Sequence, residues 1–431
     1  MLISVLAALA AILIIAVFIA RPNFSLYALA FLIPAIGWYF YVGPLVIPLT
    51  DLAALLALIA FAVRSIYTLL FEPRRRLALK WPLLFPFFIF LGISLLSSLL
   101  SDNIWSSLWY VVRWPLLLYL AYIFLPYNLI RNGPILKRTI IALALGCFLV
   151  TANGYLSLYG QDWHDSFFRI RPMAWFGIYL FGDNHNLIAE FLNVGAFLIM
   201  TWRFLVKSSR LRRSLDIAFI LTALAIVLTF SRAGWITLAL QIAVYGWFYF
   251  RAKNYSTVNL ALAGIALLIM LSPLLWKMEK LQRDNASSTE NRWLLTEIAW
   301  QAYDRKPYLG YGSGEFVNLV DENIRFRAKY GLAIDSHGVL QKVLAENGIF
   351  GLAAWLFIMS ALWQTSYRAI KKYYEHHPWL LPLLLAGAGG LFFQLFNTSY
   401  YKGKVWLPIA IGLAAIRLLD VKYGRKETTQ N

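Results

Sequence analysis

The chain has 431 residues, of which 60% are apolar and 14% are charged, and its mean hydropathy is +0.64. Soluble domains contain about 45–50% apolar residues, so this composition excludes a soluble protein and indicates an integral membrane protein. Lys and Arg outnumber Asp and Glu by 39 to 21, giving a net charge of +18. Because this excess falls largely in the loops between apolar segments, it indicates membrane topology and not nucleic-acid binding.

The apolar segments have the length of helices that cross a bilayer, about 17–25 residues, and lack the alternation of a membrane β-barrel. They predict an all-α polytopic protein with 12 or 13 transmembrane helices, and whether both of the first two segments span is left open. The first segment lacks the basic start and cleavage site of a secretory signal, so we expect it to be retained. The predicted spans are 2–20, 23–41, 46–69, 81–100, 107–127, 138–157, 185–202, 214–230, 233–250, 256–276, 348–367, 379–396 and 404–420.

Short loops rich in Lys and Arg predict the cytoplasmic side of the protein. All six fall on one side of the predicted topology: 72–80, 131–138, 203–213, 251–253, 367–372 and 421–426. The longest polar segment then faces outward, and we expect transmembrane helices with short loops over 1–276, a large extracytoplasmic loop subdomain over 277–347, and C-terminal transmembrane helices with a basic tail over 348–431. Within the loop, NRWLLTEIAWQAYDRKP (291–307) predicts an amphipathic helix that ends at its proline.

Arg232 lies in LTFSRAGW (228–235), at the bend of an apolar hairpin whose two ends carry basic, cytoplasmic loops. The hairpin places this arginine on the outer side, against the usual charge rule. One interpretation is an arginine that reaches the lipid headgroups. The other is an anion site, since a guanidinium at the membrane surface suits a pyrophosphate whose lipid tail stays in the bilayer.

Several other basic residues are weaker candidates for an anion site. Arg292 stands near the expected start of the loop helix, and its charge alone does not distinguish it from Arg305. Arg169 and Arg171 have aromatic neighbours that also fit a plain interfacial belt. Asn184 and Asn186 flank His185, where amides suit either hydrogen bonds to sugar hydroxyls or helix caps.

His337 lies in SHGVLQKVLAENGIFG (336–351), at the end of the long polar segment. With Asp335 or Ser336 as the cap, we expect it in the first turn of a helix that ends near Asn347 and Gly348. The positive end of the helix dipole would favour neutral imidazole, which can act as a general base. The alternative is a histidine that satisfies a cap or a loop carbonyl, and Glu346 is expected to be structural.

Metal and cofactor chemistry is not expected. His164, Asp162 and Asp165 have no second histidine at ligand spacing, and the single Cys147 lies in an apolar segment. The chain also has no GxxxxGK[ST] loop for a nucleotide phosphate.

Three features together resemble the bacterial O-antigen ligase superfamily, which includes O-antigen ligases, O-antigen polymerases and protein O-oligosaccharyltransferases. They are Ser231-Arg232 at a hairpin, Arg292 on a helix that leads into Pro307, Gly310 and Gly312, and the pattern His337, Leu340, Glu346, Gly348, Gly351. They span residues 184 to 351 with the long loop in the expected place.

The resemblance implies a metal-independent, inverting transfer of a preassembled glycan from undecaprenyl pyrophosphate to an acceptor hydroxyl, such as one of lipid A-core. The reaction would occur on the periplasmic face of the bacterial inner membrane. Arg232 and Arg292 would hold the pyrophosphate, and His337 would activate or position the acceptor hydroxyl. Arg171, Asn184 and Asn186 are candidate substrate contacts.

Two rival interpretations stay open. A polymerase would use the same donor site with a second lipid-linked glycan as acceptor, and the sequence does not separate it from a ligase. A transporter of lipid-linked glycans would also need arginines on the outer side, but it should line a polar path through the membrane. Ionisable residues in the spans are few, Asp51, Arg64 and Glu190 being candidates near their ends, which favours a transferase.

Overall fold

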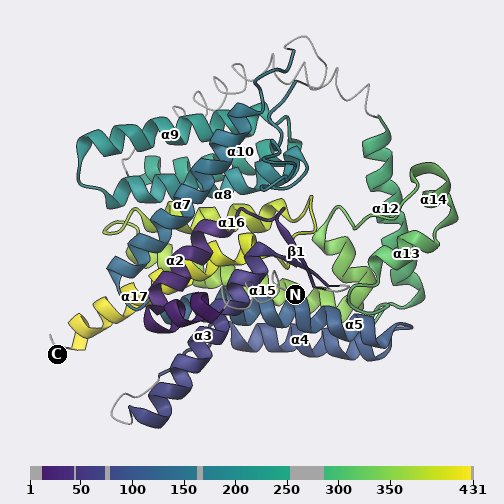
Figure 1. The fold of residues 1–431 in the computed structure, drawn as a ribbon, viewed down its shortest axis with the longest axis horizontal. Coiled ribbons are helices and arrows are strands. Elements are labelled where there is room, and N and C mark those ends of the chain that lie inside the picture. The colour runs from purple at the N-terminus through teal and green to yellow at the C-terminus, as the bar shows by residue number, and fades with distance from the viewer. Residues whose placement is uncertain (1–11, 43–44, 73–77, 163–167, 253–285, 429–431) are drawn as a thin grey trace.

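The computed structural model describes residues 12–42, 45–72, 78–162, 168–252 and 286–428. A helix at Ile12–Ala20 is followed by the elements labelled in Figure 1. Their bounds are α2 Pro22–Leu32, β1 Tyr39–Val42, β2 Leu45–Pro48, α3 Leu49–Phe71, α4 Leu84–Leu99, α5 Ile104–Val111, the π-helical turns η1 Val112–Leu116 and η2 Leu118–Phe124, α6 Leu125–Leu129, α7 Gly133–Leu156, α8 His185–Leu205, α9 Ser209–Leu228, α10 Arg232–Ala252, α12 Ala286–Arg305, α13 Phe316–Glu322, α14 Ile324–Tyr330, α15 Val339–Tyr373, α16 Leu380–Phe393 and α17 Gly403–Thr428.

The predicted all-α polytopic class is confirmed. Among the described residues, six helices are long and apolar enough to cross a membrane: Leu49–Phe71, Ile104–Leu129, Gly133–Leu156, His185–Leu205, Arg232–Arg251 and Val339–Tyr373. The first two helices, bent by 120° at their junction, would together make a seventh span, and α4 and α16 are shorter apolar helices. The predicted segment 256–276 lies outside the described residues, so the count of 12 or 13 stays a prediction.

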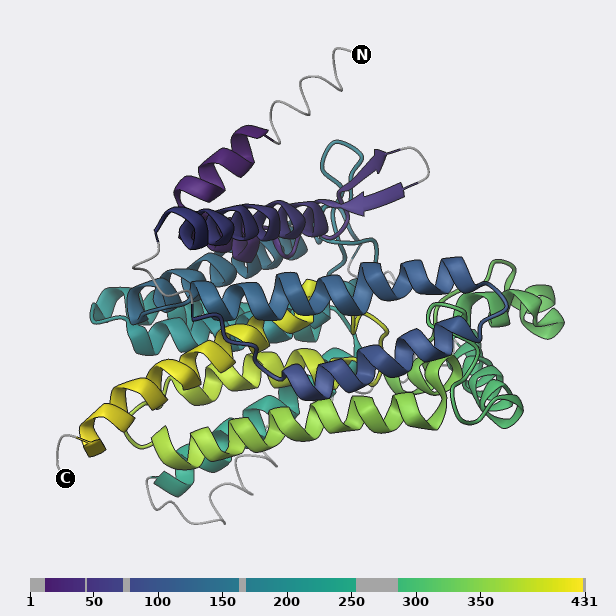
Figure 2. The ribbon, with the colours of Figure 1, turned by 90° about the horizontal axis from the view of Figure 1, so that it is seen from below.

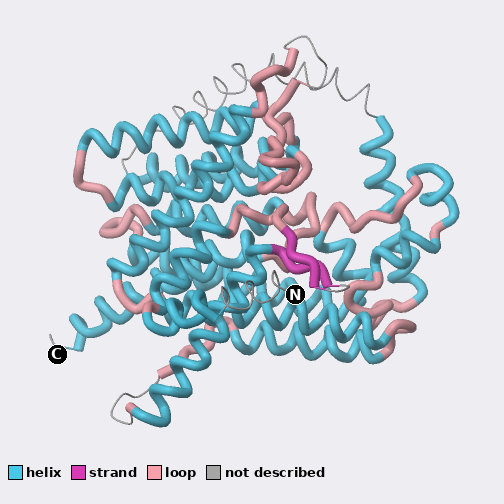
Figure 3. The backbone as a smooth tube through the Cα atoms, in the orientation of Figure 1, coloured by secondary structure: helices cyan, strands magenta, loops and turns pink. Residues whose placement is uncertain are grey.

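The predicted span 23–41 is wrong in its second half. The helix α2 ends at Leu32, and the chain continues into a two-stranded antiparallel hairpin, in which Tyr39 pairs with Pro48. Pro34 lies two residues after the end of α2, and it has no N–H with which to continue the helical hydrogen bonds. In the described part of the chain, the strands are confined to this hairpin (Figure 3).

Helix α8 is the centre of the bundle. It packs against α7, α9, α10 and α16, and 72% of its most apolar 18-residue stretch is buried. Several other long helices of the bundle also run along the length of the molecule (Figure 2). A helix so enclosed can hold polar side chains only where partners exist, so the residues at its start are placed by their neighbours.

A smaller core lies at one end of the bundle, in residues 286–347, which we term the loop subdomain. Its helices α12, α13 and α14 bury Leu295, Ile298, Phe316 and Phe326 against Ala345 near the start of α15. The predicted loop helix is α12, although its tryptophans point outward. The α8–α9 connection and the end of α17 lie at the opposite end of the molecule (Figure 1).

Candidate functional site

Ser231 and Arg232 form the turn between α9 and α10. Phe230 turns the chain with a left-handed backbone (φ 53°), and Ser231 Oγ accepts a hydrogen bond from the Gly234 N–H at 3.2 Å, which caps α10. The same hydroxyl donates to Asn186 Oδ1 at 2.7 Å. Arg232 is the first residue of α10, and its side chain is exposed. The serine therefore anchors the turn to α8 and leaves the arginine directed away from the bundle core.

The two candidate asparagines have different roles at the start of α8. Asn184 is the N-cap, since its Oδ1 accepts hydrogen bonds from the N–H groups of Asn186 and Leu187 at 2.9 and 3.1 Å. Asn186 instead receives the Ser231 hydroxyl. Of the two interpretations of this segment, the cap describes Asn184, and Asn186 joins α8 to the arginine turn.

Arg169, and not Arg171, approaches His185. Arg169 Nη1 lies 3.4 Å from His185 Nε2, whereas Arg171 is exposed. The Gln161 side chain holds this segment through the Arg169 N–H and carbonyl, at 3.2 Å each. Burial lowers the pKa of Arg169, and the charge of Arg171 lowers it further. The two arginines are two positions apart on an irregular segment and face different surroundings. Such a segment has no helix or strand period, so the sequence could not predict which arginine approaches His185.

Arg292 lies in the second turn of α12, because this helix begins at Ala286 and not, as expected, near Arg292. Its side chain is half-buried, and among the described residues its buried Nε has no hydrogen-bond partner. Burial lowers the pKa of the guanidinium, and the nearby charge of Arg232 lowers it further, although an arginine stays charged in proteins. A buried donor without a partner is costly, so this position favours an anionic ligand.

Helix α12 is fixed to α15 by a short polar chain. Gln341 Nε2 donates to Thr296 Oγ1 at 2.6 Å, and this hydroxyl donates to the Arg292 carbonyl at 2.8 Å. The backbone of Arg292 is thus linked through two side chains to the first turns of α15. The distance between Arg292 and His337 is therefore set by packed helices and not by a loose loop.

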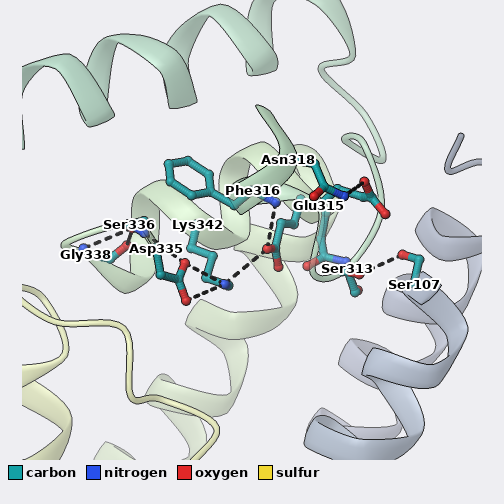
Figure 4. A network of polar contacts seen from close by, with 11 residues as sticks. Ser107, Ser313, Glu315, Phe316, Asn318, Asp335, Ser336, Gly338 and Lys342 are labelled. Carbon is teal, nitrogen blue, oxygen red and sulfur yellow. Dashed lines mark hydrogen bonds and ion pairs between the residues drawn. The ribbon is translucent and has the colours of Figure 1, made fainter. Parts of the chain in front are cut away.

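The prediction that His337 lies in the first turn of a helix is wrong. His337 lies two residues before α15. The helix begins at Val339, whose N–H donates to the Gln394 carbonyl at 2.9 Å. Asp335 accepts hydrogen bonds from the Ser336 N–H at 2.8 Å and from the buried Lys342 Nζ at 2.7 and 2.8 Å (Figure 4). These bonds hold the segment that carries His337 against α15.

The charges around His337 favour its neutral form. Burial lowers the pKa of this imidazole from its ordinary value of 6.5, Arg292 lowers it further, and Asp335 opposes the shift. The expectation of a neutral imidazole agrees with this direction, but the cause is burial with an arginine and not a place inside the helix. A neutral imidazole can accept a proton near neutral pH.

Electrostatic contacts connect the side chains of the site across four elements. Arg232 acts on Arg292, and Arg292 acts on both His337 and His185. In the described part of the chain, no carboxylate forms an ion pair with Arg232 or Arg292, and the nearby Asp335 is bonded to Lys342. Two arginines without carboxylates beside a neutral histidine can bind an anion and accept a proton. We refer to Arg232, Arg292 and His337 as the arginine–histidine site.

The glycine motifs of the loop and of α15 bind each other. At Gly348 the helix is broken (φ 64°, ψ −163°), a conformation that a side chain would strain. The N–H groups of Ile349 and Phe350 donate to the carbonyls of Pro307 and Tyr308, at 2.8 and 3.3 Å. In return, the carbonyls of Ala345 and Glu346 accept from the N–H groups of Tyr311 and Gly312, at 3.1 and 2.9 Å.

We call these reciprocal backbone bonds between residues 307–312 and 345–350 the clasp. The Glu346 side chain adds to it, which agrees with the expected structural role. Its Oε1 accepts the Phe316 N–H at 3.2 Å and lies 3.3 Å from Lys342 Nζ. Its carbonyl also accepts the Ser97 hydroxyl at 2.6 Å. The clasp therefore fixes the loop subdomain to both α15 and α4, close to the His337 segment.

The described residues do not group the side chains that usually bind a metal ion. Among the described residues, no three or more His, Cys, Asp and Glu side chains gather closely enough to hold one. His164 and Asp165 lie outside the described residues. The expectation of a metal-free, cofactor-free reaction therefore stays a prediction.

These features define a polytopic helical membrane protein in which a loop subdomain and the starts of several helices bring arginines and histidines together. Residues 217–356 match a family model described as O-antigen ligase. The match supports the O-antigen ligase superfamily and indicates, in general, a glycosyltransferase-like membrane enzyme that acts on lipid-linked glycan and acceptor substrates. It covers Arg232, Arg292 and His337, whereas Arg171, Asn184 and Asn186 lie outside it. A search of the curated proteins found no match.

Proposed function

We propose that the protein transfers a preassembled glycan from undecaprenyl pyrophosphate to an acceptor hydroxyl, with lipid A-core as the acceptor. The observation that carries this proposal is the pairing of Arg232 and Arg292, which lack carboxylate partners among the described residues, with the half-buried His337. Two guanidinium groups match the charge and geometry of a pyrophosphate. The neutral imidazole beside them matches a base.

In this mechanism the acceptor hydroxyl gives its proton to His337 as its oxygen attacks the anomeric carbon of the glycan. The new glycosidic bond forms on the face opposite the leaving group, so the anomeric configuration inverts. The bond from that carbon to the phosphate oxygen breaks, and the undecaprenyl pyrophosphate leaves with the electron pair. Arg232 and Arg292 stabilise the charge that develops there, and no metal ion or nucleotide takes part.

The distribution of basic residues between the two ends of the helical bundle supports a reaction on the periplasmic side of the bacterial inner membrane. The basic α8–α9 connection and the end of α17 lie opposite the loop subdomain (Figure 1), and Lys and Arg accumulate on cytoplasmic loops. Arg171 is exposed, and its charge acts on Arg169, which lies 3.4 Å from His185 at the start of α8. We assign to contacts with the glycan Arg171 and the side-chain amide N–H groups of Asn184 and Asn186, because the Oδ1 atoms of both asparagines are already bonded.

The direct test is transfer by the purified full-length protein in the presence of EDTA. Undecaprenyl-pyrophosphate-linked oligosaccharide is mixed, in separate tubes, with lipid A-core, with additional donor or with a serine-rich acceptor protein. We expect product with lipid A-core, and a loss of at least about 100-fold in His337→Ala, since a general base contributes about 10²–10⁴-fold. The matched control is His377→Ala, because His377 lies between α15 and α16 and contacts the Tyr423 hydroxyl at 2.9 Å.

Each result has a defined meaning. Product only with additional donor would make the protein a polymerase, and product only with the acceptor protein would make it a protein glycosyltransferase. Full activity of His337→Ala would remove His337 from the mechanism. No product in any tube, with donor binding intact, would favour a transporter of lipid-linked glycans.

A further inference from the structure

His185 is a second histidine beside the arginine–histidine site, and the proposed mechanism gives it no role. It is the first residue of α8, and its side chain is partly buried. The next residue, Asn186, receives the hydroxyl of Ser231, which directly precedes Arg232. The start of α8 is therefore fixed to the turn that carries one of the two arginines of the site.

The proton on the His185 ring can be placed from its neighbour Arg169. Arg169 Nη1 lies 3.4 Å from His185 Nε2, and the two atoms share a hydrogen bond. A guanidinium has N–H donors and no acceptor, so Nε2 must be the acceptor and carries no proton. An imidazole with one unprotonated nitrogen is neutral and carries its proton on the other nitrogen, which is Nδ1. His185 is thus a neutral ring with a donor at Nδ1 and an occupied acceptor at Nε2.

The Nδ1 donor of His185 has no hydrogen-bond partner among the residues that the structure describes. The charges that act on the ring belong to Arg169 and Arg292, and both are cations. A guanidinium has no lone pair to offer this N–H, so neither arginine can be its partner. A donor among positive charges suits an anionic acceptor, and hydrogen bonds to ionised groups are the stronger kind.

Arg292 connects His185 to the other residues of the site. Its charge acts on both His185 and His337, and the charge of Arg232 acts on Arg292. The two histidines differ in one respect. The acceptor nitrogen of His185 is bound by Arg169, whereas no nitrogen of His337 is bound in this way in the described part of the chain. His185 is therefore suited to donate a hydrogen bond, and His337 is suited to accept a proton.

We propose that His185 binds the pyrophosphate together with Arg232 and Arg292, by donating a hydrogen bond from Nδ1 to one of its oxygen atoms. Arg169 is then a positioning residue, because it fixes the tautomer that makes this donor available. The assignment to the pyrophosphate rests on the proposed transferase function. A neutral donor adds a directed hydrogen bond to the leaving group without adding a third positive charge beside the two arginines, and a donor held in place in advance needs no reorganisation during the reaction.

The first test measures binding without transfer. Full-length protein in detergent is titrated by calorimetry with farnesyl pyrophosphate, a short isoprenoid pyrophosphate, in the presence of EDTA. His185→Ala should weaken binding at least about tenfold, since a hydrogen bond to a charged group is lost. His185→Asn should recover most of this loss, because its amide lies at the δ position, like Nδ1. His185→Gln should bind as weakly as His185→Ala, because its amide lies at the ε position, beside Arg169.

The matched control is His376→Ala, because His376 is an exposed histidine between α15 and α16. This variant should bind farnesyl pyrophosphate as the wild type does, and an equal loss in it would overturn the assignment to His185. The proposal is also overturned if the wild type does not bind the pyrophosphate, if His185→Ala binds it as tightly as the wild type, or if His185→Asn binds it no better than His185→Gln. The last comparison decides the matter even if the alanine variant does not fold.

The second test separates a donor from a base through the pH dependence of transfer. His185→Ala should lower the rate at every pH and leave the acid limb, which belongs to His337, at its wild-type position. Disappearance of the acid limb in His185→Ala would make His185 the base and overturn its role as a donor. Failure of the transferase function is seen separately, as full activity in His337→Ala or as no transfer by wild type, while the calorimetry still decides whether His185 binds the pyrophosphate.

Discussion

Charged residues are treated in opposite ways in two regions of this molecule. Inside the bundle, Lys404 and Glu190 form an ion pair at 2.6 Å, and both side chains are only 2% exposed. Gln394 and Asn397 donate to the two oxygens of Glu190, at 2.9 and 2.8 Å. In the arginine–histidine site, Arg232 and Arg292 have no such carboxylate among the described residues. Charged side chains in the bundle therefore join helices, whereas the two arginines of the proposed site remain available to an anionic ligand.

The largest expected effect is on stability, from breaking the bundle pair. Lys404→Ala leaves Glu190 buried without its cation, and removing one partner of a buried pair costs about 3–5 kcal/mol. Thermal unfolding of the purified protein should show this loss. The double variant Lys404→Met with Glu190→Met should recover much of it, since no buried charge then remains. A single variant as stable as wild type would contradict the bundle half of the comparison.

The next effect is on catalysis, from the site. In the proposed mechanism Arg292→Gln removes a cation that stabilises the leaving pyrophosphate, so we expect a loss of about 10²–10³ in rate, or about 2.7–4 kcal/mol. Because Arg292 has no carboxylate partner in the described structure, the unfolding temperature of the Arg292→Gln variant should fall much less than that of the Lys404→Ala variant. Transfer kinetics and thermal unfolding measured together test both statements. A large loss of stability with normal transfer would make Arg292 a structural residue.

A smaller effect should appear in the pH dependence of transfer. The proposed mechanism needs neutral His337. Because the pKa of this imidazole is lowered from its ordinary value of 6.5, the rate should fall only below about pH 6.5. Arg292 lowers this pKa, so Arg292→Gln should move the acid limb to higher pH. Asp335 raises it, so Asp335→Asn should move the limb to lower pH. Shifts in the same direction for both variants would contradict this assignment.

The smallest effect should come from a charge pair outside both regions. Arg325 Nη1 lies 3.2 Å from Glu297 Oε2, with side chains 67% and 48% exposed. Exposed ion pairs contribute about 0.2–1 kcal/mol and are screened by salt. Arg325→Gln should therefore change the unfolding temperature little and leave transfer unchanged. It serves as the matched control for Arg292→Gln, and a rate loss of similar size would undermine the special position of Arg292.

The helices of the bundle could be predicted from hydropathy because bilayer length and apolar composition are properties of the segment itself. The predicted span 185–202 and α8, His185–Leu205, begin at the same residue. The hairpin after α2 was missed because its apolar residues continue those of α2 without a polar break. Short apolar runs do not distinguish strand from helix, and the signals of the change were the breaking residues Pro34, Gly37, Gly43 and Pro44.

The site was predicted in its parts but not in its geometry. Arg232 was recognised because its place at a hairpin bend conflicts with the charge rule, which is a property of the sequence. The start of α12 was predicted near Arg292, between one and two turns too late, and His337 lies two residues before α15 and not in its first turn. Helix ends depend on caps and tertiary contacts, such as the Gln394 carbonyl that binds the Val339 N–H.

Other residues of the site had no local signal. Lys342 lies on α15 like any surface lysine of an amphipathic helix, and its burial against Asp335 and Glu346 depends on how the loop subdomain folds over it. Arg169 differs from Arg171 only in which neighbours it meets.

The break at Gly348 has a consequence for the order of folding during synthesis. The loop subdomain cannot complete its core or bond its Tyr311 and Gly312 amides until Ala345 and Glu346 have been made. The carbonyls of Pro307 and Tyr308, in contrast, are already present when the Ile349 and Phe350 amides emerge. The exposed segment must therefore wait for the next membrane helix to begin, and that helix meets its hydrogen-bond partners as soon as it appears. Completion of the loop subdomain is thus tied to the synthesis of the first residues of α15.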